Sequence, residues 1–149
     1  MREERKICTF YVNNYFFGID VCNILEVIRY QEMTFAPLAD ERISGLINLR
    51  GQIVTAINMR NRLEFPLLPD NERPTNVIIS TEDGAISLLV DDIGDIIDIS
   101  ADNFEPSPEN LKGEIRAVLK EVCKFEGKLL LILNVEQILN LDPSENKDS

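Results

Sequence analysis

The groups in this sequence that could do chemistry are carboxylates, arginines and thiols, because the chain contains no histidine. Without an imidazole, Ser–His–Asp triads, histidine metal sites and histidine acid–base catalysis are excluded. The seven glycines are dispersed and form neither a P-loop nor a GxGxxG pattern, so a nucleotide site is not indicated. The sequence therefore predicts no catalytic residue, no metal ligand and no cofactor.

Paired carboxylates are the one enzymatic alternative that remains. The stretch DDIGDIID, residues 91–98, carries several acids, and two suitably spaced carboxylates could hydrolyse a glycosidic bond. Acids that alternate with apolar residues along a strand are more typical of its solvent-exposed side. We interpret the stretch as a strand surface, and a carboxylate hydrolase stays as the alternative from the enzyme class.

An ion pair is the second kind of chemistry that the sequence suggests. The stretch SGLINLRGQIVTAINMR, residues 44–60, places arginines between apolar runs suited to a sheet interior. Arg50 and Gly51 mark a tight turn, because glycine adopts positive φ at little cost. Glu26 lies at the end of a predicted short helix, and a sheet fold could bring it to Arg50. We hypothesise a Glu26–Arg50 ion pair that bridges two parts of the fold; the alternative is that Arg50 is a solvated turn residue.

The three cysteines, Cys8, Cys22 and Cys123, are widely spaced and contain no CxxC pair. This pattern argues against a disulfide framework and against a zinc site, and it predicts buried, reduced thiols. The charged N-terminus does not resemble a signal peptide, and no apolar run reaches the length of a membrane span. A cytoplasmic protein without direct membrane insertion is the expectation.

Composition excludes another class of partner. The 149 residues contain 44% hydrophobic residues, enough for one domain with a real core, and the formal net charge is −11. A field of this sign repels phosphate backbones, so nucleic acid is not an expected partner. A barrel that binds single-stranded nucleic acid is the alternative from the binding class, and the charge opposes it.

Short strands joined by turns must position these groups. Turn signals every 8 to 12 residues and little helix are typical of closed sheets or barrels. Hairpins are predicted at residues 6–19, 46–58, 76–90 and 118–134, with a further strand at 91–100. A short helix capped by Asp20 and a closing helix capped by Asn134 are also predicted. Residues 64–75 and 101–117 are interpreted as loops, and residues 142–149 as a disordered tail after one domain at 1–141.

Four segments, in order along the chain, resemble the CheW family of chemotaxis coupling proteins. They are FGIDVCNILEVI (17–28), ISGLINLRGQIVTAINMR (43–60), ISLLVDDIGDIIDI (86–99) and LLLILNVEQIL (129–139). The most specific part, GLINLRG, is similar to the family pattern G-x-x-N-x-R-G. The chain departs from the family at Ala56 and Asn58, where proline and aspartate are usual, and at Ser87, which replaces a common glycine.

The resemblance implies a mainly β fold of two SH3-like five-stranded β-barrels that share a hydrophobic core, with one or two short helices including a C-terminal one. It also implies a non-enzymatic adaptor. Such proteins couple the cytoplasmic tip of a chemoreceptor to the regulatory domain of the histidine kinase CheA in receptor arrays, where further CheW copies can form rings. A coupling protein of a non-flagellar system, for pili or development, is the alternative within the family.

Eight positions match residues with a functional role in the family. The resemblance implies partner-binding or groove-forming roles for Ile24, Glu26, Gly45, Arg50, Gly51, Val77, Ile78 and Ile96. The last three are expected in the second barrel, at apolar positions near the receptor groove. Core packing is the alternative for each of these three.

Overall fold

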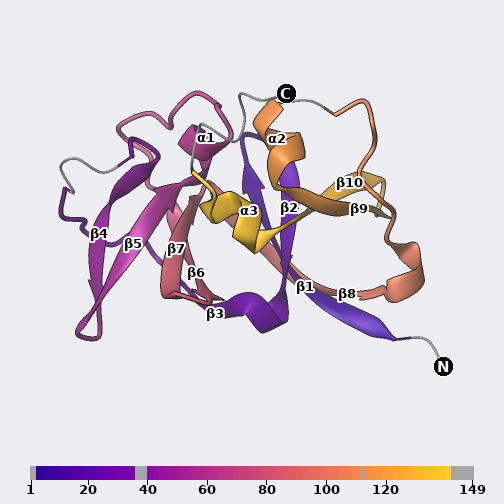
Figure 1. The fold of residues 1–149 in the computed structure, drawn as a ribbon, viewed down its shortest axis with the longest axis horizontal. Coiled ribbons are helices and arrows are strands. Elements are labelled where there is room, and N and C mark those ends of the chain that lie inside the picture. Colours follow the sequence, from indigo (N-terminus) through magenta and orange to yellow (C-terminus); the bar gives the residue numbers. More distant parts are fainter. Residues whose placement is uncertain (1–2, 36–39, 112, 142–149) are drawn as a thin grey trace.

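The computed structural model describes residues 3–35, 40–111 and 113–141, and the tail predicted at residues 142–149 lies outside them. The described chain is mainly β, with two five-stranded sheets and a few short helices, as predicted. In Figure 1 one sheet lies on the left and the other on the right, with the closing helix between them.

The first sheet is built from the two ends of the chain, and its strand order is β8-β1-β2-β10-β9. The strands are β1 (Glu4–Val12), β2 (Tyr15–Asp20), β8 (Asp92–Ser100), β9 (Leu119–Phe125) and β10 (Lys128–Leu133). Strands β1 and β2 reverse at Asn13 and Asn14, whose φ angles of 52° and 69° are of the kind that asparagine tolerates. The hairpins predicted at both ends of the chain are therefore confirmed.

The second sheet is built from the middle of the chain, in the order β3-β6-β7-β5-β4. The strands are β3 (Ile24–Ile28), β4 (Ile43–Leu49), β5 (Gln52–Asn58), β6 (Thr75–Thr81) and β7 (Gly84–Val90). Both sheets contain one parallel pair, β2 with β10 and β5 with β7, and every other pair is antiparallel. The two sheets thus share a pattern although no strict sequence repeat is present.

The largest hydrophobic cluster joins the two sheets. Phe17 and Leu131 from the first sheet belong to the same buried cluster as Val77 and Leu88 from the second. Smaller clusters lie within each sheet, one around Ile7 and Leu130 and one around Ile47 and Ile78. The shared core expected from the sequence is present, and it fixes the two sheets against each other.

The helix predicted after Asp20 is wrong for most of its length. Asp20 does accept a hydrogen bond from the Cys22 amide at 3.3 Å, but the helical segment is a 3-10 turn, Val21–Asn23. From Ile24 onward the chain is strand β3, which pairs antiparallel with β6. Strand pairing overrides the helical spacing of the apolar residues because Ile24, Val27 and Ile28 are β-branched and suit a half-buried sheet.

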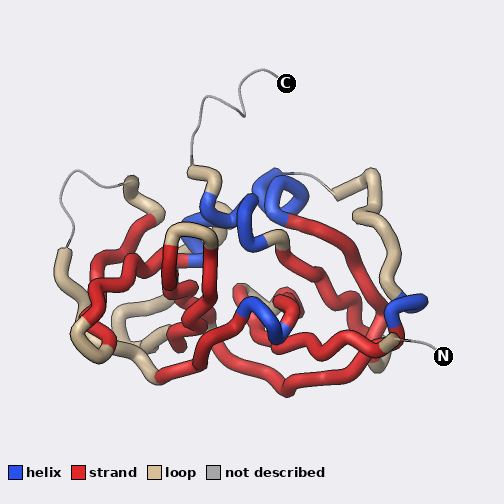
Figure 2. The backbone as a smooth tube through the Cα atoms, turned by 60° about the horizontal axis from the view of Figure 1, so that its bottom comes forward, coloured by secondary structure: helices blue, strands red, loops and turns tan. Residues whose placement is uncertain are grey.

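Helix is confined to short segments, as the tube in Figure 2 shows. Helix α3 (Val135–Leu139) is present as predicted, with the Asn134 side chain accepting a hydrogen bond from the Gln137 amide at 3.2 Å. Two other helices were not predicted: α1 (Met59–Arg62), which follows β5, and α2 (Gly113–Val118), which lies in the predicted second loop. Both are too short to show a periodic apolar stripe.

The cysteines are all free, but they are not all buried. Cys8 and Cys123 are buried, and burial raises the pKa of both thiols. Cys22 is exposed, contrary to the prediction. It lies in the 3-10 turn, and its apolar sequence neighbours do not cover it because that segment is a turn and not a packed helix.

Candidate functional site

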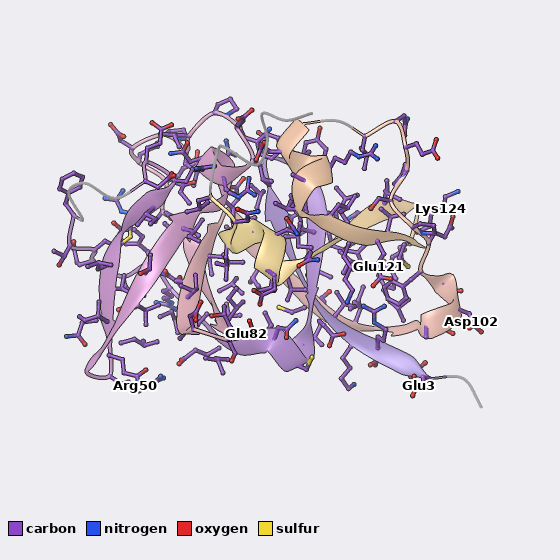
Figure 3. The ribbon with its side chains drawn as sticks, in the orientation of Figure 1. Glu3, Arg50, Glu82, Asp102, Glu121 and Lys124 are labelled. Atoms are coloured by element: carbon purple, nitrogen blue, oxygen red, sulfur yellow. The ribbon has the colours of Figure 1, made fainter. Side chains whose placement is uncertain are left out.

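Glu26 and Arg50 form the predicted ion pair. The Arg50 Nη2 donates to Glu26 Oε1 at 2.8 Å, and the Nη1 donates to the second carboxylate oxygen, so the pair is bidentate. The two residues are 24 positions apart, one on β3 and one at the turn between β4 and β5. The pair therefore joins the two edge strands of the second sheet, and Figure 3 shows Arg50 at the tip of the β4–β5 hairpin.

The turn that carries Arg50 is held by its own sequence. Arg50 and Gly51 both adopt positive φ, 52° and 85°, which is the conformation of a two-residue hairpin turn. The Asn48 side chain accepts a hydrogen bond from the Gly51 amide at 3.0 Å. A side-chain carbon at Gly51 would meet no atom within 4 Å, so backbone conformation and not lack of space selects glycine here. The role of Gly51 is thus to form the turn that presents Arg50.

The pair is exposed on the arginine side. The Arg50 side chain is 71% exposed and the Glu26 side chain 27%. The hydrogen bonds from Arg50 lower the pKa of the Glu26 carboxyl, and the same contacts raise the pKa of Arg50. An exposed pair is screened by salt and adds little to stability, so its geometry is better suited to recognition than to holding the fold.

The lowered pKa of Glu26 can be tested directly. A group whose folded-state pKa is depressed stays ionised above its ordinary pKa and loses its pairing only as the pH falls through the lowered value. We expect an NMR titration of the Glu26 side-chain carbon to show a midpoint below the ordinary value of 4.5, and the Arg50→Ala variant to move it back upward. Equal midpoints in the two proteins would contradict the pairing in solution.

Exposed apolar side chains lie on the same elements as the ion pair. Leu25 and Val27 flank Glu26 on β3 and are 57% and 39% exposed, and Ile53 on β5 is 66% exposed. Large apolar side chains next to an oriented charged pair are the composition of a protein-binding surface. These five residues, Leu25, Glu26, Val27, Arg50 and Ile53, are called the Glu26–Arg50 surface below.

Gly45 closes the second sheet and does not lie on its surface. Thr34 and Leu46 exchange two backbone hydrogen bonds of 2.8 Å, which attach the segment after β3 to β4. A side-chain carbon at Gly45 would come within 2.7 Å of the Thr34 carbonyl oxygen. Glycine is needed here because only a residue without Cβ permits this approach.

Replacing Gly45 by alanine is expected to lower the free energy of unfolding by roughly 1–3 kcal/mol, the usual cost of overpacking against backbone. Chemical denaturation measures the change. Gly84→Ala is the matched control for loss of a β-strand glycine, since no atom lies within 4 Å of that position and only backbone strain contributes. A Gly45→Ala protein as stable as the parent would show that the segment at Thr34 moves away freely.

The three apolar positions expected in the second barrel are divided between the sheets. Val77 and Ile78 lie on β6, in the same sheet as β3, where Val77 pairs with Val27 and Ile78 with Glu26. Both are buried and cannot touch a partner directly; as consecutive strand residues they point to opposite faces, Val77 into the core shared by the two sheets and Ile78 into the smaller cluster with Ile47. Only Ile96, on β8, belongs to the other sheet, and it is 63% exposed. Ile24 is half-buried and packs against the shared core.

Two further ion pairs involve arginines to which the sequence gave no role. Arg60, on α1, makes two hydrogen bonds of 2.9 and 2.7 Å to Asp91, at the start of the chain's return to the first sheet. Asp91 also accepts from the Asn13 amide at 2.7 Å, so the pair ties α1 to the β1–β2 turn. Arg62 is 3% exposed and pairs with Glu114 of α2. Neither partner could be identified without the tertiary structure.

The departures at Asn58 and Ser87 each have a structural role. The Asn58 side chain caps α1 by accepting from the Asn61 amide at 3.2 Å. Ser87 is fully buried and donates to the Asn76 side chain at 2.7 Å, and Asn76 in turn donates to the Arg29 carbonyl at 3.1 Å. Buried polar groups are stable when they are paired in this way.

The described ranges contain neither a cluster of potential metal ligands nor a helix that could span a membrane. Within residues 3–35, 40–111 and 113–141, no three His, Cys, Asp or Glu side chains are grouped so that they could hold a metal ion. No helix in these ranges has both the length and the apolar character needed to cross a membrane.

Known proteins are similar to this chain over nearly its whole length. The sequence model of a family described as the CheW-like domain matches residues 6–142. The chain is 27% identical over 146 residues to the chemotaxis protein CheW of Bacillus subtilis, with 98% of this chain and 94% of the relative covered. It is 24% identical over 142 residues to the chemotaxis protein CheW of Treponema pallidum, with 93% of this chain and 84% of the relative covered.

A solved structure shares the fold. The crystal structure of the scaffolding protein TtCheW from Thermoanaerobacter tengcongensis superimposes with a TM-score of 0.86 at 24% sequence identity. The superposition covers 94% of this chain and 95% of that one. The arrangement of the two five-stranded sheets is therefore the arrangement of a known fold with two SH3-like domains.

Proposed function

The chain belongs to the CheW-like domain family, and from that premise we propose that it is an adaptor that couples the cytoplasmic tips of chemoreceptors to the histidine kinase CheA. It acts by binding in the cytoplasm, where it is recruited to receptor arrays, and it helps to set the activity of the kinase there. Copies of the chain can also take places in rings within the array. No step of this function requires a catalytic residue or a cofactor.

The observation that carries the proposal is the Glu26–Arg50 surface. Its bidentate ion pair fixes the positions of a carboxylate and a guanidinium, and the exposed side chains of Leu25, Val27 and Ile53 lie on the same strands. Interfaces gain most of their binding free energy from a few such apolar and arginine side chains.

An adaptor needs two contact surfaces, and Ile96 supports a second one. It lies on β8 of the other sheet. The same strand also carries exposed acids and Ile93, which is 36% exposed. Strand β8 is at the end of the strand order of its sheet. A protein that binds receptor and kinase simultaneously would use surfaces of this kind on separate sheets.

The test is a pair of calorimetric titrations of the purified protein, one against the CheA regulatory domain and one against a receptor signalling-tip fragment. We expect binding to both, and we expect Arg50→Ala and Ile96→Asp each to weaken one partner more than the other. Asp83→Ala, at the exposed β6–β7 turn, is the control and leaves both affinities unchanged. The adaptor function requires both interactions, so a protein that failed to bind the receptor fragment or the CheA domain would refute it.

A further inference from the structure

A hollow of about 220 Å³ lies under the proline-rich loop that follows α1. Its walls come from segments far apart in the sequence: the segment after β3, strands β4, β5 and β7, helix α1 and the loop itself. Its lining includes Tyr30, Met33, Ser44, Asn58, Leu68 and Leu89. The proposed adaptor function assigns no role to this hollow.

The hollow is separate from the Glu26–Arg50 surface. Asn58 is the last residue of β5, whereas Arg50 precedes the first residue of that strand. Helix α1, which follows Asn58, lies at the top of Figure 1, and Figure 3 places Arg50 at the bottom of the same sheet. A ligand in the hollow would therefore leave the ion pair free.

The charged groups at the base of the hollow neutralise each other. Arg60 donates from Nε and Nη2 to Asp91 and from Nη1 to the Pro66 carbonyl at 2.7 Å. Asp91 receives these two bonds and one from the Asn13 amide. The pair is only 16% and 18% exposed, so it offers a ligand neither a free cation nor a free anion.

Two neutral donors at the hollow have spare capacity. The Asn58 side-chain oxygen is used to cap α1, but among the described residues its amide nitrogen donates to no protein acceptor. The Ser44 hydroxyl likewise has no hydrogen-bond partner in the described chain. Beside them lie the side chains of Met33 and Leu68, which are half-buried, and of Leu89, which is buried. Apolar walls with a few free polar groups are characteristic of small-molecule sites.

The rim disfavours an anionic ligand. Arg73 lies over the Tyr30 ring at 5.3 Å, and Asp70 and Glu72 are exposed nearby. An anion would meet two carboxylates in a protein whose net charge is −11, whereas at the base of the hollow Asp91 is already paired with Arg60 and the remaining donors are neutral. We propose that the hollow binds a small uncharged molecule with an apolar body and a carbonyl group, which accepts hydrogen bonds from Asn58 and Ser44.

The experiment is an NMR titration of the full chain with phenylacetamide and, separately, with isovaleramide. We expect saturable shifts of the backbone amides of Met33, Ser44 and Asn58, with a dissociation constant on the order of 1 mM for ligands of this size. Phenylacetate, which has the same shape and a negative charge, should bind about tenfold more weakly. Absence of saturable shifts with both amides, or equal binding of phenylacetate, would overturn the proposal.

Variants separate the hollow from other surfaces. Leu68→Trp fills the hollow from the loop, and Ser44→Ala removes one donor; we expect the first to abolish binding and the second to weaken it about fivefold. Ile53→Ser, on the Glu26–Arg50 surface, should leave binding of the amides in the hollow unchanged. Unchanged binding in both hollow variants, with folding verified from the same spectra, would refute the site. The readout involves neither receptor nor kinase, so it is independent of the adaptor function.

Discussion

Replacing Arg62 by glutamine should lower the free energy of unfolding by roughly 3–5 kcal/mol, the cost of removing one partner from a buried charged network. Arg62 is 3% exposed, and all three of its guanidinium nitrogens donate hydrogen bonds. It donates to the carbonyls of Ile138 and Gln137 at 2.9 Å each and pairs with Glu114. Arg62, the last residue of α1, thus connects α1 to both α2 and α3.

The size of the effect follows from what the substitution leaves behind. Glutamine has one donor group in place of the planar fork, so most of the carbonyls at the end of α3 and the Glu114 carboxylate lose their partner. Burying an unpaired charge or carbonyl costs more than the pair itself contributes. Helix α3 has only five residues, so we expect its position to depend on these contacts as well as on the burial of Val135 and Ile138.

Thermal unfolding checks this prediction, with a fall in Tm of roughly 10 °C expected for a chain of this length. Arg116→Gln is the matched control: Arg116 lies in α2, is exposed, and donates to the carbonyls of Glu109 and Leu111. It should change Tm by no more than about 2 °C. Similar losses in the two variants would show that the Arg62 network does not hold α3.

Replacing Arg50 by alanine should have the opposite profile, with coupling of receptor to kinase reduced by about tenfold or more and Tm nearly unchanged. The Arg50 side chain is 71% exposed, so its loss opens no cavity and buries no charge. What it removes is the partner that orients the Glu26 carboxylate beside Leu25 and Val27. This prediction rests on the proposed adaptor function.

Arg60→Ala is the informative comparison because we expect it to lower stability and leave coupling intact, the reverse of Arg50→Ala. Its pair with Asp91 is largely buried, and the hydrogen bonds to Asp91 raise the pKa of Arg60. Removal leaves Asp91 with only the Asn13 amide, so we expect a loss of roughly 3 kcal/mol of stability. Coupling, measured as kinase activity in a reconstituted receptor complex below the lowered Tm, should be retained. Equal coupling defects in Arg50→Ala and Arg60→Ala would contradict a special role for Arg50.

The sequence determined the local reversals and the residues of the ion pair. Asn13–Asn14, Arg50–Gly51 and Glu126–Gly127 all adopt positive φ at predicted hairpin turns, and each pair contains an asparagine or a glycine, which tolerates this conformation. Asn134 caps α3 as expected. The turns and the helix cap depend on residues a few positions apart, so the chain's local stereochemistry is sufficient to specify them.

Only the tertiary structure determines which strands and which charged side chains pair across the fold. Residues 24–28 have helical apolar spacing, yet they form a strand because β6 offers them hydrogen bonds and burial. That pairing places Ile78 opposite Glu26 and Val77 opposite Val27, whereas Ile96 lies in the other sheet. The partners of Arg60 and Arg62 are 31 and 52 residues away. No local pattern encodes such contacts, because they exist only once the two sheets have packed on their common core.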